Sequence, residues 1–337
     1  MSEQTGSVKK YLKYAILAVA IFGLLFAFTN LEELKRRLVT MNLVFFSVAL
    51  AFSIVNYLAE GLFLRLSLMV FDEKLPLGAA FKYSLLINSL GYLVSLGGLT
   101  PFATQVYFLG FHGIKAKKAT LSRIVQLIFF NISFNLFFIF GFLFLITGNE
   151  IHGFNRAIII VVFCAFLAAI FFFYTAIFSK PFQLIVVKSL FCGLNRILRV
   201  FSKRVQLEDH KAIRYFDDFA NGFRGLLKVP SRLISMAAIT LFDMLVWIGV
   251  LYFSFLALRY AIHPGVLFIG FAVGQIVSVA SMIPGGMGTM EGSMALVYSL
   301  FGVPFETALG AVLLYRFVFN IIPFIISAPL YLSLRKR

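Results

Sequence analysis

The chain has 337 residues, of which 61% are hydrophobic and only 13% are charged, whereas a typical soluble domain has about 25% charged residues. This composition excludes an ordinary soluble globule and predicts an all-α polytopic membrane protein with a single membrane domain, residues 1–337. The net charge of +16 predicts a topology biased by Lys and Arg, and attraction to anionic lipids rather than to nucleic acid. Because the two cysteines and four histidines are scattered, we expect no metal ion and no cofactor.

Six apolar stretches have about the 20 residues that a membrane-spanning helix needs. In chain order they are Tyr11–Thr29, Met41–Val70, Ala119–Thr147, Ala157–Phe178, Leu233–Leu258 and Glu306–Leu334. The first follows a lysine cluster and lacks a small-residue cleavage site, so we interpret it as a retained span and not as a signal peptide.

Two further apolar blocks, Leu77–Phe111 and Val266–Val303, are interrupted by the motifs SLGGLTPFATQ and SMIPGGMGTMEGSM. Proline ends a helix and glycine lets the chain reverse, so both blocks are predicted to be broken or re-entrant helical hairpins. A backbone break in hydrocarbon leaves polar groups unpaired, and it is tolerated only inside protein or beside a water-filled cavity. The distribution of Lys and Arg favours cytoplasmic termini, but it does not distinguish re-entrant hairpins from full crossings.

The segment 179–232 alternates apolar and basic residues at helical spacing, as in FQLIVVKSLFCGLNRILRVFSKRV. This pattern predicts an amphipathic segment in the cytoplasmic membrane interface, with its basic side chains facing the headgroups. A solvated pair of cytoplasmic helices is the alternative interpretation.

The sequence also contains an internal repeat. Aligning Pro101 with Pro284 places GYLVSLGGLTP over GQIVSVASMIP, and the same register places Glu60 over Asp243. Each repeat, 41–147 and 233–334, then consists of a span, an interrupted block and a span, and the predicted topology makes the two repeats antiparallel. Inverted repeats with broken helices at matching positions predict a transport site near the middle of the membrane.

The candidate substrate-binding residues lie in the two breaks or on the helix after the second break. They are Thr100, Thr104, Gln105, Gly285, Gly286, Gly288, Thr289, Glu291, Tyr315 and Arg316. A lone Arg316 near mid-membrane would need a partner, and Glu291 is the first candidate. Thr289 is expected to cap the helix after the break, whose free amides would suit a phosphate. Glu60 and Asp243 are possible proton carriers, or carboxyl groups that only tie helices together.

The stretch IPGGMGTMEGSMALVYSLFGVPFETALGAVLLYRFVFNIIPFIIS resembles the second signature of the lysylphosphatidylglycerol synthase transmembrane-region family, through its PGG-x-G-x-x-E core and Tyr315–Arg316. The stretch LTPFATQVYFLGFHGI resembles the first signature, without the longer glycine-rich form of many relatives. That family includes the flippase half of the multiple peptide resistance factor. The resemblance implies a flippase-like domain that moves phospholipids, aminoacyl-phospholipids or polyprenyl-phosphate-linked lipids. We expect no synthase activity, because the acyltransferase-like domain of fused members has no counterpart in this chain.

Two other functions fit part of the pattern. An ion-coupled carrier of a small solute would share the inverted repeat and the carboxyls at mid-membrane. A membrane-embedded transferase acting on a lipid-linked sugar would need a nucleotide or metal site, for which FDDF at Phe216–Phe219 is the candidate. The expected location is the plasma membrane. The expected partners are anionic lipids, and either a second copy of the chain or a separate lipid-modifying enzyme.

Overall fold

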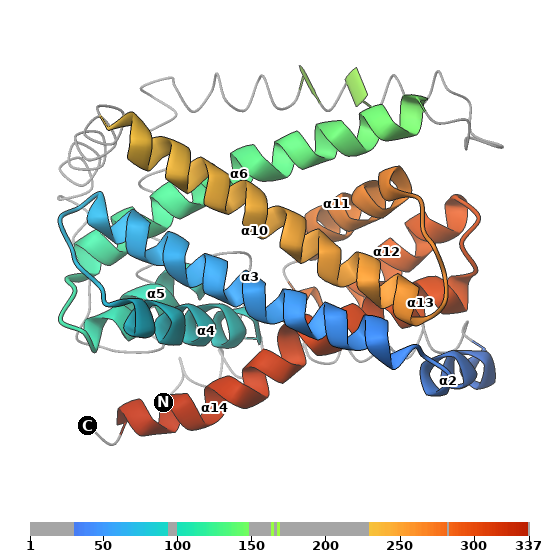
Figure 1. Ribbon diagram of the computed structural model, residues 1–337, viewed down its shortest axis with the longest axis horizontal. Helices are drawn as coiled ribbons and strands as arrows, with labels where there is room; N and C mark the ends of the chain where they lie inside the picture. Colours follow the sequence, from blue (N-terminus) through green and yellow to red (C-terminus); the bar gives the residue numbers. More distant parts are fainter. Residues whose placement is uncertain are drawn as a thin grey trace, which may run out of the picture.

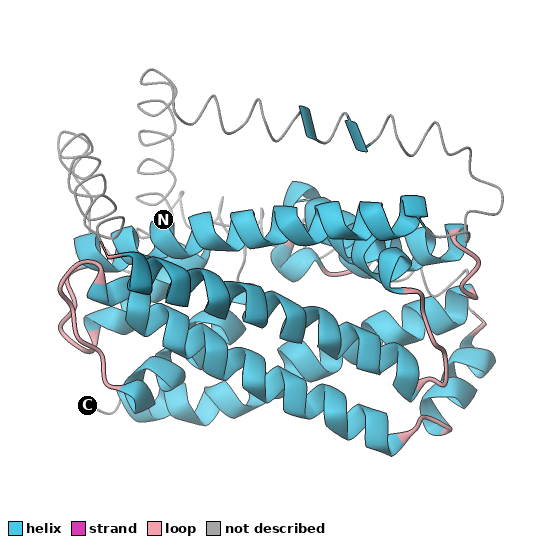
Figure 2. Ribbon diagram, turned by 45° about the horizontal axis from the view of Figure 1, so that its top comes forward, coloured by secondary structure: helices cyan, strands magenta, loops and turns pink. Residues whose placement is uncertain are grey.

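The computed structural model describes residues 30–93, 100–147, 163–164, 167–168, 229–281 and 283–335. Within these residues every regular element is a helix (Figures 1 and 2). The predicted span Tyr11–Thr29 and almost all of the predicted span Ala157–Phe178 lie outside the described residues, as does the interfacial segment up to residue 228.

Five described helices are long and apolar enough to cross a membrane. They are α3 (Leu43–Met69), most of α6 (Ala116–Thr147), α10 (Pro230–Ala257), α11 (Pro264–Ser281), and the continuous helix formed by α13 (Phe305–Arg316), η3 (Phe317–Ile321) and α14 (Ile322–Arg335). Four of them match predicted spans. The fifth, α11, is the first arm of the second interrupted block, so this arm alone is long enough to cross.

The helices α3 and α10 lie side by side and run in opposite directions through the molecule (Figure 1). The Asn42 N–H donates to the carbonyl of Ala257 over 2.7 Å, and the Asn56 side chain donates to the Asp243 carboxyl over 2.8 Å. Asn56 follows Asn42 by fourteen residues and Asp243 precedes Ala257 by fourteen, so both bonds belong to one antiparallel register. Small residues allow such close helix contact in membranes. Gly249 is one of them, because a Cβ there would lie 2.6 Å from the Phe52 ring.

Both interrupted blocks form pairs of helices. The first contains α4 (Leu77–Leu93) and α5 (Thr100–Gly110), and the residues between them, 94–99, lie outside the described part. The second contains α11, the short 3-10 turn η2 (Pro284–Gly286) and α12 (Thr289–Leu300). The predicted break in the second block is therefore confirmed. The two blocks meet, since α4 contacts η2 and also packs against α14.

The largest apolar core lies among α10, α11, α12 and α13, and its fully buried members include Phe255, Tyr298 and Tyr315. Two glycines on α11 bring α12 close: a Cβ at Gly270 would lie 2.0 Å from the Tyr298 ring, and one at Gly274 would lie 2.3 Å from a Met294 side-chain carbon. This packing fixes α12, and with it the break that precedes α12.

A short amphipathic helix, α2 (Leu31–Val39), was not anticipated from the sequence. It begins at Asn30, whose side chain accepts the Glu33 N–H over 3.1 Å. The Glu33 carboxylate pairs with Arg36 and Arg37, and the hydrogen bond from Arg36 holds the pKa of Glu33 below its ordinary value. The structure thus pairs both arginines of the basic run KRR, residues 35–37, with one acid.

Candidate functional site

The break between α11 and α12 depends on glycine. Gly285, Gly286 and Gly288 have φ angles of 63°, 60° and 80°, in the left-handed region that residues with a side chain rarely adopt. At Gly286 space is also lacking, because a Cβ would lie 1.9 Å from the Ser278 hydroxyl oxygen. The sequence therefore forces a sharp reversal here, and it leaves backbone carbonyls without helical partners.

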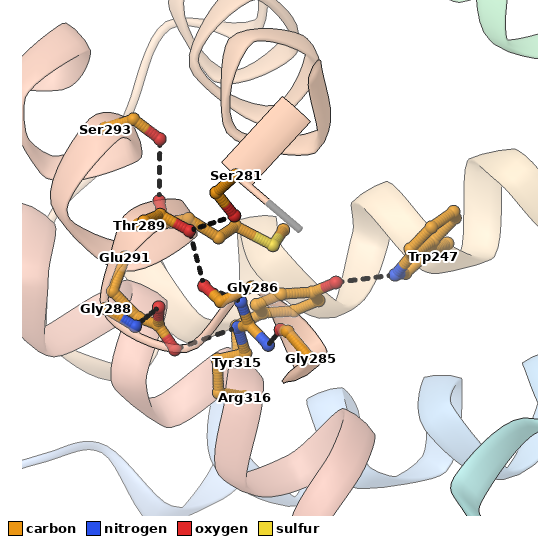
Figure 3. Close-up of polar contacts among 11 residues, drawn as sticks. Trp247, Ser281, Gly285, Gly286, Gly288, Thr289, Glu291, Ser293, Tyr315 and Arg316 are labelled. Carbon is orange, nitrogen blue, oxygen red and sulfur yellow. Dashed lines mark hydrogen bonds and ion pairs between the residues drawn. The ribbon is translucent and has the colours of Figure 1, made fainter. Parts of the chain in front are cut away.

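Arg316 supplies partners for two of these carbonyls (Figure 3). Its side chain extends from the end of α13, and the residue is only 6% exposed. Nη1 donates to the Gly285 carbonyl over 2.8 Å and Nη2 to the Gly286 carbonyl over 3.4 Å, while Nε lies 3.2 Å from Oε1 of Glu291. Arg316 and Glu291 thus form the ion pair that the sequence led us to expect. The guanidinium also holds the broken backbone, which the sequence did not indicate.

Glu291 occupies the N-terminus of α12. Its second carboxylate oxygen accepts the Gly288 N–H over 2.8 Å, and an acid in this position is favourable because the helix dipole is positive here. Gly288, and not Thr289, is the N-cap residue, so the predicted capping role of Thr289 is wrong. The Thr289 hydroxyl instead donates to the Gly286 carbonyl and to the Ser281 hydroxyl, each over 3.1 Å (Figure 3).

We call this group the latch: Gly285, Gly286, Gly288, Glu291 and Arg316. In the latch the position predicted for a phosphate, at the start of α12 and beside the guanidinium, is taken by the Glu291 carboxylate. An anionic ligand therefore reaches Arg316 only by replacing Glu291 or the two carbonyls. Arginine suits such an exchange, because its planar group binds carboxylate and phosphate with the same geometry.

Tyr315, another predicted site residue, lies in an aromatic cluster next to the latch. Its hydroxyl accepts the Trp247 indole N–H over 2.7 Å, and both rings stack on Phe319 with centroids 5.6 Å and 5.4 Å away (Figure 3 shows the hydrogen bond). Tyr315 is 1% exposed, so it holds α10 against the helix that carries Arg316. Sequence reasoning missed Trp247, and no motif marks it.

The helix after Arg316 is wound more loosely, as the π-helix η3. Two hydroxyls of α3 donate to its carbonyls: Ser53 to Val318 over 3.2 Å and Tyr57 to Phe319 over 3.1 Å. Short π-helical segments are frequent at functional sites. The structure thus connects α3 directly to the helix that carries the latch arginine.

The predicted residues of the first break tie the first hairpin together. Thr104 donates to the carbonyls of Pro101 and Ile87, over 3.1 Å and 3.4 Å. Gln105, fully buried, donates to the Ser122 hydroxyl and thereby links α5 to α6. Thr100 is the first residue of α5, and its side chain lies outside the described part.

A second polar cluster lies where α3 and α10 cross. Half-buried Glu60 accepts the Asn88 side-chain N–H of α4 over 2.5 Å, and half-buried Asp243 accepts that of Asn56. The two carboxyls, aligned in the sequence, are close enough to interact electrostatically, and Arg123 of α6 also acts on Glu60. Asn56 and Asn88 were missed, although Asn56 precedes Glu60 by one helical turn.

A small hollow between α6, α10 and α11 is apolar, with lining side chains such as Phe134, Met244 and Phe268. The polar groove expected between the two hairpins stays a prediction. No group of three or more His, Cys, Asp or Glu side chains in the described part of the chain is placed to hold a metal ion.

Several apolar helices of spanning length, with a polar broken hairpin packed among them, define a polytopic α-helical membrane protein. The model of the family described as "Lysylphosphatidylglycerol synthase TM region" matches residues 12–327, and the chain therefore belongs to this family. A curated relative from Methanothermobacter thermautotrophicus, named UPF0104 membrane protein, is 28% identical over 120 residues. The match covers 33% of this chain and 36% of that relative, so the chain matches about a third of the relative's length. The family resemblance found in the sequence is confirmed.

Proposed function

We propose that this protein moves a lipid with an anionic headgroup between the two leaflets of the plasma membrane, as a transporter and not as an enzyme. The substrate classes are phospholipids, aminoacyl-phospholipids and polyprenyl-phosphate-linked lipids. The observation that carries this proposal is the latch, an Arg–Glu pair on a broken backbone buried inside a membrane protein. The family description, which names the membrane region of a lipid synthase, supports a lipid as the substrate.

The latch supplies the chemistry that a lipid phosphate needs. A phosphate that replaces the Glu291 carboxylate would keep Arg316 neutralised and would meet the N-terminal amides of α12, where helices favour anions. The acyl chains would stay in the surrounding lipid while the headgroup passes between the hairpins. Glu291 competes with the substrate and restores the latch after each passage.

Several observations support an inverted repeat as the basis of movement. The first helices of the two repeats, α3 and α10, run antiparallel, and each is followed by a helical hairpin. The aligned glycines Gly91 and Gly274 both face the second arm of their own hairpin. A Cβ at Gly91 would lie 3.0 Å from the Thr104 hydroxyl oxygen, and one at Gly274 would lie 2.3 Å from Met294. Rocking of one repeat against the other would then expose the site to each side in turn.

The test is a leaflet-exchange assay. Purified protein is reconstituted into vesicles whose fluorescent phospholipid or polyprenyl phosphate is present in both leaflets, and dithionite is added outside to quench the outer label. We expect the inner label to become quenched with the protein and to stay protected with Arg316→Met. Glu306→Gln, a half-buried acid in the first turn of the helix that carries Arg316, serves as the control that retains activity. Protection of both kinds of probe in the presence of the unaltered protein would refute the proposal.

The carboxyl cluster at Glu60 and Asp243 favours a second candidate, an ion-coupled carrier of a small solute. Native mass spectrometry separates the two. A lipid that co-purifies with the protein and is lost in Arg316→Met supports lipid transport, whereas a water-soluble compound in its place supports the carrier. Cytoplasmic termini, and association with a second copy or with a lipid-modifying enzyme, are further proposals that rest on the sequence.

A further inference from the structure

The crossing of α3 and α10 contains a buried acceptor without a donor. Asn56 is 1% exposed, and its Nδ2 donates to Asp243, but its Oδ1 has no hydrogen-bond partner among the described residues. Buried polar atoms are almost always paired, so a group that completes this site is expected. We propose that Glu60 and Asp243 share one dissociable proton at this crossing, with the Asn56 amide between them.

The charged groups at the crossing balance only if one further positive charge is present. Glu60 and Asp243 supply two carboxyls, and Arg123 of α6 supplies one guanidinium near Glu60. Tyr57, also near Glu60, is uncharged and donates its hydroxyl hydrogen to the Phe319 carbonyl. With both acids ionised the cluster has one negative charge in excess, which is costly inside a membrane. One proton makes the cluster neutral.

The hydrogen bonds indicate where the proton resides. Asp243 already accepts an N–H from Asn56, as its ionised form does best. Asn56 and Glu60 are four residues apart on α3 and therefore lie on the same helix face. A proton on Glu60 forms an O–H that donates to Oδ1 of Asn56, which completes the pairing of this buried atom, while Oε2 of Glu60 keeps its bond from Asn88.

The consequence concerns the two repeats and rests on the proposed function. Release of the proton to water breaks one O–H bond, leaves both carboxyls ionised and removes the donor from Asn56. The crossing then has an uncompensated charge at the contact between α3 and α10, which are the first helices of the two repeats. A change of protonation at this point would favour a different position of one repeat relative to the other, and so couple lipid movement to a proton.

The test is infrared difference spectroscopy of the purified full chain during acidification. We expect a carbonyl band of a protonated carboxyl that is lost in Glu60→Gln and unchanged in Glu306→Gln. In Asp243→Asn the band should form only at lower pH, because Arg123 alone then neutralises the ionised Glu60. If Glu60→Gln does not fold, the unaltered protein labelled with ¹³C-glutamate replaces it, and the band must shift with the label. The proposal fails if the band is present unchanged in Glu60→Gln, if it ignores the label, or if sodium at constant pH abolishes it where potassium does not.

The same preparations separate this proposal from lipid transport. If the Glu60 band is present but fluorescent lipids stay in their leaflets, the shared proton stands and the proposed function fails. If lipids move and no such band exists, the function stands and the shared proton is overturned. When both hold, a pH-sensitive dye inside the vesicles should show proton movement with Glu306→Gln and none with Glu60→Gln.

Discussion

The latch makes a quantitative prediction about the stability of the protein. Arg316→Met removes the guanidinium but keeps a long side chain, so the Gly285 and Gly286 carbonyls lose their donor and Glu291 loses its partner. Breaking a buried ion pair by removing one partner costs about 3–5 kcal/mol. Because about 1.4 kcal/mol is a tenfold change, the unfolding equilibrium should shift by roughly 100-fold or more.

The companion variant Glu291→Gln separates the effect of the Glu291 charge from the effect of its hydrogen bond at the start of α12. Its amide oxygen still accepts the Gly288 N–H, but its NH₂ group faces Arg316 and leaves the guanidinium charge unpaired. The double variant Glu291→Gln/Arg316→Met contains neither charge. Its loss of stability should therefore be smaller than the sum of the single losses, by about 1–3 kcal/mol, as is typical for residues in direct contact.

The assay uses unfolding of the detergent-solubilised protein by SDS, followed by the fluorescence of Trp247, the single tryptophan of the chain. Glu306→Gln is the control, with an expected change of less than about 1 kcal/mol because its acid is half-buried outside the latch. Additive effects of the two single variants, or single losses below about 1 kcal/mol, would refute the reasoning. Additive effects would mean that Arg316 and Glu291 do not interact, and small single losses would mean that the guanidinium does not hold the break.

Three further variants test individual contacts by the same unfolding assay. Gly286→Ala should lower the free energy of unfolding by at least about 1–2 kcal/mol, because alanine is strained in the left-handed backbone conformation. Adding Ser278→Gly should restore the part of this loss that is due to the steric clash. No restoration would contradict the close approach of the two residues. Tyr315→Phe should shift the Trp247 emission, since the indole N–H loses its acceptor, and lower stability by about 0.5–1.5 kcal/mol; an unchanged emission spectrum would exclude this hydrogen bond. Ser53→Ala removes a hydrogen-bond donor to the π-helix and should also lower stability by about 0.5–1.5 kcal/mol. An unchanged stability would show that the carbonyl of Val318 finds another donor.

The spanning helices were predictable because apolar length is a direct consequence of membrane thickness. Leu233–Leu258 was expected and Pro230–Ala257 is observed, and the three other spans that were predicted and described agree as closely. The break was predictable for a similarly local reason, since the glycine and proline content of PGGMG rules out a continuous helix. The short helix α2 also had a sequence signal, with Asn30 before two acids and with arginines in its last turn. It was not predicted, because nine residues are too few to show a clear apolar periodicity.

The partners of the site residues were harder to foresee. Arg316 binds backbone carbonyls that lie about thirty residues earlier in the chain, and no pattern of side chains reveals a carbonyl that a turn leaves unpaired. Thr289 looked like a helix cap because threonine often is one, but Gly288 is the N-cap residue and its N–H is accepted by the Glu291 carboxylate. The π-helix and the asparagine at the α3–α10 crossing depend on tertiary contacts, which periodicity does not encode.

The free energy of the buried Arg316–Glu291 pair indicates that the latch has a role beyond stability. A buried Arg–Glu pair seldom stabilises a protein more than well-packed apolar residues would, so stability alone does not account for charges at this point. The pair becomes advantageous if one partner is exchanged. A phosphate with one negative charge, replacing the Glu291 carboxylate, leaves the net charge of the pair unchanged and still faces the start of α12, while Nη1 and Nη2 of Arg316 keep the Gly285 and Gly286 carbonyls. The exchange thus preserves both the charge balance and the broken backbone, which a transporter needs if a headgroup is to enter and leave without unfolding the hairpin.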